Sequence, residues 1–89
     1  MVHSKKALGK HWAVSTGNIL AARAAQKILL RGGSAVDAAI TADAVMGVVE
    51  PMATSIGGDV LAIITLAGED PVAYNGTGRS PALLTSKLV

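Results

Sequence analysis

The feature that most constrains the fold is the stretch 35–49, in which nearly every side chain is small or branched and apolar. Gly32, Gly33 and Ser34 precede it and Pro51 follows it, which is the usual pattern of helix start and stop signals. A helix with so little polar surface is poorly suited to a solvated position. The sequence therefore predicts a helix at 35–49 around which the rest of the chain is built.

Several side chains support the boundaries of this helix. Ser34 and Asp37 have the three-residue spacing of a capping box, and Gly32 is suited to the left-handed residue that ends a preceding helix. Asp43 is the lone carboxylate in the middle of the apolar stretch. We expect Asp43 to be paired or to lie on the one solvated edge of the helix, because an unpaired buried charge is costly.

An amphipathic helix is predicted N-terminal to the helix at 35–49. In residues 19–31 apolar side chains recur at helical spacing, and Asn18 is a suitable N-cap. The run 12–15 is short enough for a strand, and residues 1–11 form a basic segment that we expect to be mobile.

The second half of the chain predicts two strands. The continuous apolar run 60–66 indicates a strand buried on both faces, and 72–75 indicates an antiparallel strand returning from a turn. Before them, Gly57 and Gly58 predict a backbone conformation that residues with side chains avoid. Residues 76–81 are predicted to form an exposed loop, and residues 83–89 to be the truncated end of a larger unit.

Together these elements predict an α+β fold with one helix layer on a small sheet, incomplete by itself. Burying one Val or Ile side chain contributes about 1.5–3 kcal/mol, so an uncovered row of them favours association. We therefore expect the open sheet face to be covered by further polypeptide or by a second copy of the chain, which would make a homo-oligomer.

Composition excludes several classes of function. A net charge of +2 with one Trp and one Tyr gives no reason to expect a nucleic-acid partner. No apolar run approaches the roughly 18 residues of a membrane span, and no signal peptide is evident, so a cytoplasmic location is expected. There is no Cys, and no other potential metal ligand accompanies His3 and His11 at a suitable spacing. Neither a metal nor a cofactor is therefore predicted.

Three spaced motifs resemble the N-terminal part of the gamma-glutamyltransferase family, also called gamma-glutamyltranspeptidases. They are residues 32–39 (GGSAVDAA), 47–51 (GVVEP) and 56–59 (IGGD). The resemblance covers about residues 12–82, which we treat as one segment of such a domain. It implies part of the αββα sandwich of the N-terminal nucleophile hydrolases and a reaction that transfers or hydrolyses gamma-glutamyl amides such as glutathione.

The resemblance also implies that no catalytic residue lies in this chain. The family nucleophile is a Thr exposed by self-cleavage far downstream, whereas the threonines here are internal and lack the free amine that serves as base. We expect their hydroxyls to make local hydrogen bonds in turns and strands. These threonines are Thr16, Thr41, Thr54, Thr65, Thr77 and Thr85.

One substrate-binding residue of the family is expected within this chain, an Arg that pairs with the substrate's α-carboxylate. The corresponding stretch is 75–81 (NGTGRSP), and alignment on its proline places Thr77 at the position of that Arg and Arg79 two residues later. Two extended residues span about 6.6 Å, part of which a long Arg side chain can recover. Arg79 and Thr77 are therefore the candidate substrate-binding residues, although an ordinary solvated loop Arg remains the alternative.

The sequence leaves three alternative functions open. The departure at Thr77 leaves room for an acylase-like member with a different amide substrate. The surplus apolar strand also fits a stand-alone, self-associating interaction module. A small anion binder using the amides of Gly57 and Gly58 is a third alternative.

Overall fold

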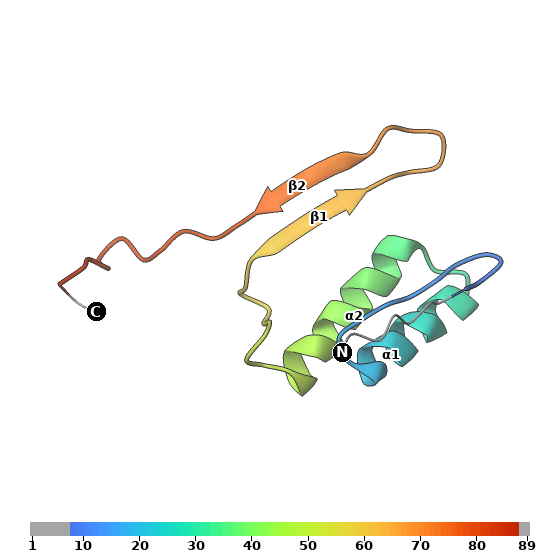
Figure 1. Cartoon of the computed structure of the whole chain (residues 1–89), viewed down its shortest axis with the longest axis horizontal. Coiled ribbons are helices and arrows are strands. Elements are labelled where there is room, and N and C mark those ends of the chain that lie inside the picture. Colours follow the sequence, from blue (N-terminus) through green and yellow to red (C-terminus); the bar gives the residue numbers. More distant parts are fainter. Residues whose placement is uncertain (1–7, 88–89) are drawn as a thin grey trace, which may run out of the picture. The chain divides into compact units, whose positions relative to one another are not determined.

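The computed structural model describes residues 8–87, so the predictions for His3, for the rest of 1–7 and for 88–89 lie outside the described residues. It contains two helices followed by a two-stranded antiparallel sheet (Figure 1), which confirms the predicted α+β class. The elements are α1 (Ile19–Leu30), α2 (Ala35–Val49), β1 (Val60–Ile64) and β2 (Val72–Gly76). The chain divides after Ile56 into a helical unit and a hairpin unit.

The ends of α1 follow the predicted signals. At its start, the Asn18 side chain accepts a hydrogen bond from the Leu20 amide at 2.8 Å. At its end, Gly32 has φ +86° and the Gly33 amide donates to the Ile28 carbonyl at 2.9 Å. This is a Schellman motif, in which a left-handed glycine lets the chain turn back over the last helical carbonyls. The helix ends at Leu30, one residue before the predicted end.

The capping box of α2 is also present. The Asp37 amide donates to the Ser34 hydroxyl oxygen, and the Ser34 amide donates to the Asp37 carboxylate, both at 3.0 Å. The helix ends at Val49, as predicted, just before Glu50 and the proline. Asp43 is exposed and accepts a hydrogen bond from the Thr54 hydroxyl at 3.4 Å, which confirms its predicted place on a solvated edge.

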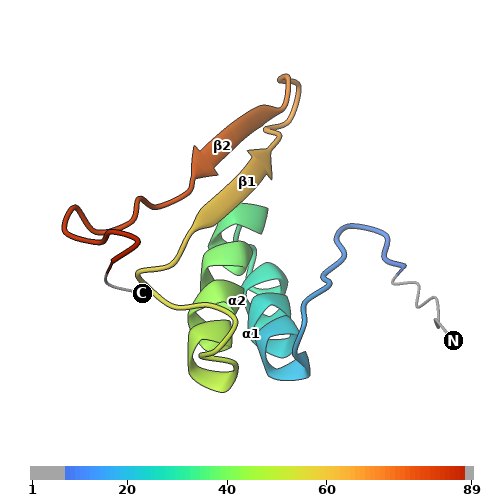
Figure 2. The same ribbon diagram turned by 60° about the vertical axis from the view of Figure 1, so that its left-hand side comes forward.

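Alanines form the contact between the two helices. Figures 1 and 2 show α1 and α2 side by side, and the buried residues of this unit are small on both helices. Such side chains let two helix backbones approach closely, toward the lower end of the usual 8–10 Å range. We call this contact the alanine seam; it consists of Ala21, Ala25, Ala38 and Ala42.

The remainder of α2 is less enclosed than predicted. Val36, Ile40 and Val48 follow one another at intervals of four and eight residues and are 39%, 65% and 80% exposed. Within the helical unit, packing against α1 therefore leaves much of the apolar surface of α2 exposed. The seam uses one side of α2, and the apolar pattern continues around the other side.

The run 12–15 does not form a strand. It has no regular secondary structure, and Val14 packs against the alanine seam while its neighbours Ala13 and Ser15 are exposed. The alternation is that of a strand, but no partner strand lies beside it within the described part of the helical unit, so no ladder forms.

In the hairpin unit, β1 and β2 pair with Val60 opposite Gly76 and Ile64 opposite Val72. The turn between them contains Gly68, whose φ is +77°. Positive φ is not found at Gly57 or Gly58, so the unusual backbone predicted for that pair is not observed. β1 also ends at Ile64 rather than at residue 66.

The predicted burial of β1 on both faces is not observed. Leu61 and Ile63 on one face are 75% and 77% exposed, and Val60 and Ile64 on the other are 48% and 40% exposed. An apolar run indicates a strand, but its burial depends on neighbouring layers that the run itself does not supply. Within residues 8–87, neither helix has the length and hydropathy required to cross a bilayer.

Candidate functional site

The candidate site is the loop that follows β2, residues 76–81, which we call the Arg79 loop. It begins at Gly76, the last residue of β2, and contains both predicted substrate-binding residues, Thr77 and Arg79. Both are exposed, so the loop presents them to solvent. Thr77 and Arg79, two residues apart in sequence, therefore both lie at one end of the hairpin.

A local turn fixes the beginning of the loop. The Asn75 side-chain oxygen accepts two hydrogen bonds from Thr77, one from its amide at 3.1 Å and one from its hydroxyl at 2.7 Å. Asn side chains commonly form such turns by bonding the backbone two residues later. The hydroxyl proton of Thr77 is therefore engaged within the loop, and its oxygen remains able to accept.

A longer-range contact fixes the next residue. The Gly78 amide donates to the Asp59 carboxylate at 2.6 Å, joining the loop to the residue just before β1. Because Val60 lies opposite Gly76, the antiparallel register brings Asp59 to the end of the hairpin from which the loop leaves. Arg79 is the residue immediately after this contact.

Sequence reasoning missed the part played by Asp59. The residue belongs to the motif 56–59, but no partner was assigned to it. The signal was available in the hairpin pattern, since a carboxylate next to the first residue of one strand lies near the backbone that leaves the last residue of the other.

Four of the internal threonines donate hydrogen bonds from their hydroxyls, and one of these, Thr41, lies in α2 rather than in a turn or strand as predicted. Thr41 donates to the Asp37 carbonyl at 2.9 Å and Thr16 to the Asn18 carbonyl at 2.6 Å. Thr54 and Thr77 donate to side-chain oxygens of nearby residues. None of these four hydroxyls has a histidine or an amine as its hydrogen-bond acceptor, which a nucleophilic Thr would require.

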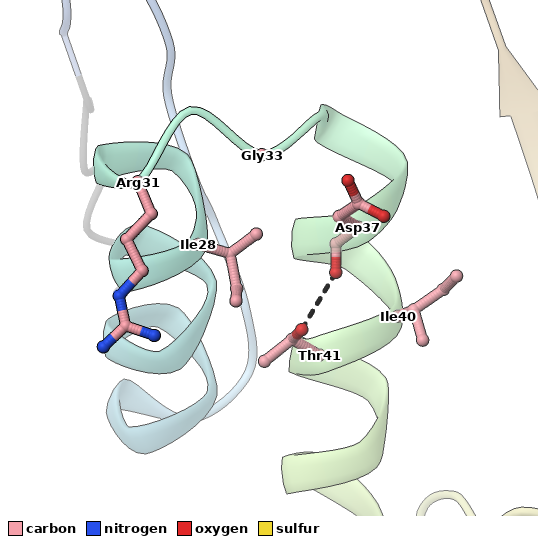
Figure 3. Close-up of a pocket in the computed structure, with 6 residues that line it drawn as sticks. All are labelled: Ile28, Arg31, Gly33, Asp37, Ile40 and Thr41. Atoms are coloured by element: carbon pink, nitrogen blue, oxygen red, sulfur yellow. Dashed lines mark hydrogen bonds between the residues drawn. The ribbon is translucent and has the colours of Figure 1, made fainter.

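A second concave region lies on the helical unit, with a volume of about 390 Å³. Figure 3 shows its lining: Ile28, Arg31, Gly33, Asp37, Ile40 and Thr41. The Asp37 carboxylate is committed to the capping box, and Arg31 extends along α1 rather than toward it (Figure 3). The region is open and lacks a convergent set of polar groups, which a small-molecule site needs.

No group of three or more potential metal ligands gathers anywhere in the part of the chain that the structure describes. The stretch 55–58 also lacks the alternation of left- and right-handed backbone that forms an anion-binding nest, since neither glycine has positive φ. The chemistry that the described residues offer is thus concentrated in the cationic, hydrogen-bonded Arg79 loop.

Comparison with known proteins identifies the family of this chain. Residues 21–89 match the family model described as gamma-glutamyltranspeptidase. The chain is 33% identical over 78 residues to glutathione hydrolase 2 of Arabidopsis thaliana, covering 88% of this chain and 14% of that protein. It is 38% identical over 79 residues to the glutathione hydrolase-like YwrD proenzyme of Bacillus subtilis, covering 86% and 15%.

A further relative is named for a different activity. The chain is 36% identical over 84 residues to the acylase ACY 1 proenzyme of Pseudomonas sp. strain SE83, covering 94% of this chain and 15% of that protein. The chain thus spans about one-seventh of the length of these relatives. Because the family match extends over most of the sequence, the resemblance seen in the three motifs is confirmed. The chain belongs to the gamma-glutamyltranspeptidase family.

Proposed function

We propose that this chain is the N-terminal structural segment of a gamma-glutamyltransferase-like enzyme that transfers or hydrolyses gamma-glutamyl amides such as glutathione. In this proposal residues outside the chain supply the nucleophile, and the chain by itself is inactive. Family membership supports the proposal, as do two relatives that are named glutathione hydrolases. Both relatives are about seven times longer than the match.

The observation that carries the proposal is the exposed hairpin with the Arg79 loop at its end. Leu61 and Ile63 are largely exposed, and such a surface is suited to further polypeptide of the same enzyme. When that polypeptide covers the hairpin, the loop leaving β2 becomes the rim of the enclosed region. A cation on this rim is well placed to meet an anionic group of the substrate.

In the proposed site Arg79 binds the substrate's α-carboxylate. A guanidinium stays charged at any physiological pH and can donate two parallel hydrogen bonds to a carboxylate. Thr77, whose hydroxyl oxygen can still accept, is adjacent to the same substrate end and is suited to the ammonium group or a bridging water. Neither residue takes part in bond breaking.

The inactivity of the chain is tested directly. The purified 89-residue chain is incubated with a gamma-glutamyl anilide, and release of the aniline is followed by absorbance. We expect no turnover above buffer, because none of the four hydrogen-bonded threonine hydroxyls has an amine or an imidazole as its acceptor. Turnover that follows the chain through purification would contradict the proposal.

The role of Arg79 is tested in a longer enzyme. The matching stretch of the Bacillus subtilis YwrD proenzyme, which is 38% identical, is replaced by this sequence, and self-cleavage into two subunits reports folding. Arg79→Ala should raise KM for a gamma-glutamyl anilide by about 10- to 100-fold with little change in kcat, as expected for a lost charge-assisted hydrogen bond. Arg79→Lys should restore part of the loss.

The matched control is Arg23→Ala, because Arg23 is also exposed but lies on α1. It should leave KM unchanged. Equal KM values for the parent chimera and Arg79→Ala, in a protein that still self-cleaves, would remove Arg79 from the substrate site.

A second candidate function is an acylase-like reaction on an amide without the gamma-glutamyl group. The similarity to the acylase ACY 1 proenzyme favours it, as does the presence of Thr77 where an Arg is expected. The natural full-length enzyme would then prefer an acyl anilide lacking an α-carboxylate, and Arg79→Ala would not change KM for that substrate. Preference for the gamma-glutamyl anilide would exclude this candidate.

A further inference from the structure

We propose that Asp59 is a positioning residue, which sets the place of the Arg79 guanidinium by holding the Gly78 backbone. Asp59 itself touches no substrate in this proposal. The inference rests on the proposed function, because it assumes that Arg79 meets a substrate carboxylate. It adds a residue that neither the family match nor the sequence pattern assigns to the site.

The hydrogen bond between Asp59 and Gly78 is the first support. Its length, 2.6 Å between the Gly78 nitrogen and Asp59 Oδ1, is short for an amide donor, as expected when the acceptor is ionised. It joins residues nineteen apart in sequence, so it is not imposed by local turn geometry. Both residues lie in the hairpin unit.

The glycines of the loop give the second support. A Cβ added at Gly78 would lie 3.1 Å from Asp59 Oδ1, and a Cβ added at Gly76 would lie 2.7 Å from the Tyr74 ring and 3.0 Å from the Val60 carbonyl. Neither glycine has positive φ. A side chain at either position would crowd these neighbours, so glycine at both favours the close approach of the loop to the end of β1.

Together with the Asn75 turn, these contacts fix the backbone up to Gly78. Arg79 is the next residue, so its Cα has little freedom relative to the hairpin. Ordering a flexible side chain on binding costs conformational entropy, and part of this cost is removed when the backbone that carries the side chain is already fixed. The predicted result is tighter substrate binding without a direct contact from Asp59.

The direction of the change in KM distinguishes a charge effect of Asp59 from a positioning effect. If Asp59 acted only through its negative charge, removing that charge would strengthen the attraction between Arg79 and a substrate carboxylate, and KM would fall. If Asp59 acts by positioning, losing the acceptor raises KM even though an unfavourable charge has gone. Asp59→Asn keeps an acceptor oxygen without the charge, and Asp59→Ala removes both.

The first experiment measures the contact in the 89-residue chain by amide hydrogen exchange and NMR. The Gly78 amide should exchange at least about tenfold more slowly than an exposed loop amide. Asp59→Ala should abolish this protection, and Asp59→Asn should retain most of it. The matched control is Asp70→Ala, which removes the same charge from the turn at the other end of the hairpin. An unprotected Gly78 amide in the parent chain would overturn the inference.

The second experiment uses the natural full-length enzyme or the chimera described above. Asp59→Ala should raise KM for a gamma-glutamyl anilide by about three- to tenfold with kcat nearly unchanged. Asp59→Asn and Asp70→Ala should leave KM at or below the parent value. Gly78→Ala, which crowds the same contact and keeps the charge, should raise KM like Asp59→Ala.

The outcomes separate this inference from the function on which it rests. If Arg79→Ala raises KM and Asp59→Ala does not, the positioning role is wrong and the proposed function stands. If neither Arg79→Ala nor Asp59→Ala changes KM although Asp59 protects the Gly78 amide, Arg79 does not contact the substrate. The positioning role of Asp59 is then wrong as well. A fall in KM with Asp59→Ala would show that only charge matters.

Discussion

At the scale of single residues, Asp37 has the most clearly perturbed ionisation in the described chain. The Ser34 backbone amide, which donates to the Asp37 carboxylate, and after it the Ser34 hydroxyl hold the pKa of the Asp37 carboxyl below its ordinary value of 3.8. Both contacts favour the charged form, since an ionised carboxylate is the better acceptor. The charge also lies in the first turn of α2, where the helix dipole favours it.

This shift predicts how stability changes with pH. Because the pKa of Asp37 is lower in the folded than in the unfolded chain, its contribution is fully present above pH 3.8 and is lost as pH falls through the folded pKa. Helix content followed by circular dichroism during acid titration should therefore fall below pH 3.8. Asp37→Asn should flatten this part of the curve.

The matched control is Asp43→Asn, on the same helix but away from its N-terminus. It should leave the low-pH decline in place. An identical acid titration for the parent and Asp37→Asn chains would contradict the assigned role of the capping box.

Residue patterns predicted the capping groups well because each cap is local. Asn18, Ser34 and Gly32 act on backbone within five residues of themselves, so sequence spacing contains the required information. The Asp59–Gly78 contact was missed because it depends on strand register, which links residues far apart. Thr77 and Arg79 were placed in one loop, and their contact with substrate stays a prediction.

At the scale of elements, the alanine seam determines how α1 and α2 pack. Ala25 is 2% exposed and Ala21 is completely buried, while no large side chain is fully buried among the described residues. The helices are therefore held by close backbone approach and by the partly buried side chains at the edges of the seam.

Enlarging a seam residue should destabilise the helical unit. Ala25→Leu inserts a larger side chain into a close helix contact, and overpacking of this kind costs about 1–3 kcal/mol. Urea denaturation followed by circular dichroism should show a lower midpoint with a similar slope. The control is Ala39→Leu, at an exposed position of α2, which should change stability by less than about 0.5 kcal/mol. Equal losses for the two variants would show that the seam is not close-packed.

Helices were easier to predict than strands in this chain. The bounds of α2 follow from Ser34 and from Pro51, whose effects do not depend on distant residues. The strand predicted at 12–15 has the expected alternation, but pairing requires a neighbour that the described helical unit does not contain. The exposure of β1 has the same origin, because sequence indicates what can be buried and not what covers it.

At the scale of the whole molecule, apolar surface dominates the hairpin unit. Leu61 and Ile63 are directed to one face of β1 and are more than two-thirds exposed. Each such side chain contributes about 1.5–3 kcal/mol when it becomes buried. We therefore expect this face to associate with further polypeptide of an enzyme or with a second copy of the chain.

Sedimentation velocity tests this tendency. We expect the 89-residue chain to form dimers or larger species at micromolar concentration, and the double variant Leu61→Lys with Ile63→Lys to sediment as a monomer. Val48→Lys, an equally exposed apolar position on α2, is the control for added charge and should associate like the parent chain. A monomeric parent chain at every concentration would remove the hairpin face as an association surface.

The two-stranded sheet has a consequence for handling the protein. Each strand pairs with only one neighbour, so the outer side of β1 and the outer side of β2 both carry unsatisfied backbone groups. Strands with this geometry can template the addition of further strands, and an apolar sequence such as that of β1 favours fibril growth. With the outer sides of both strands unpaired, the hairpin should seed ordered aggregates during storage, and Leu61→Lys or Ile63→Lys should delay their appearance.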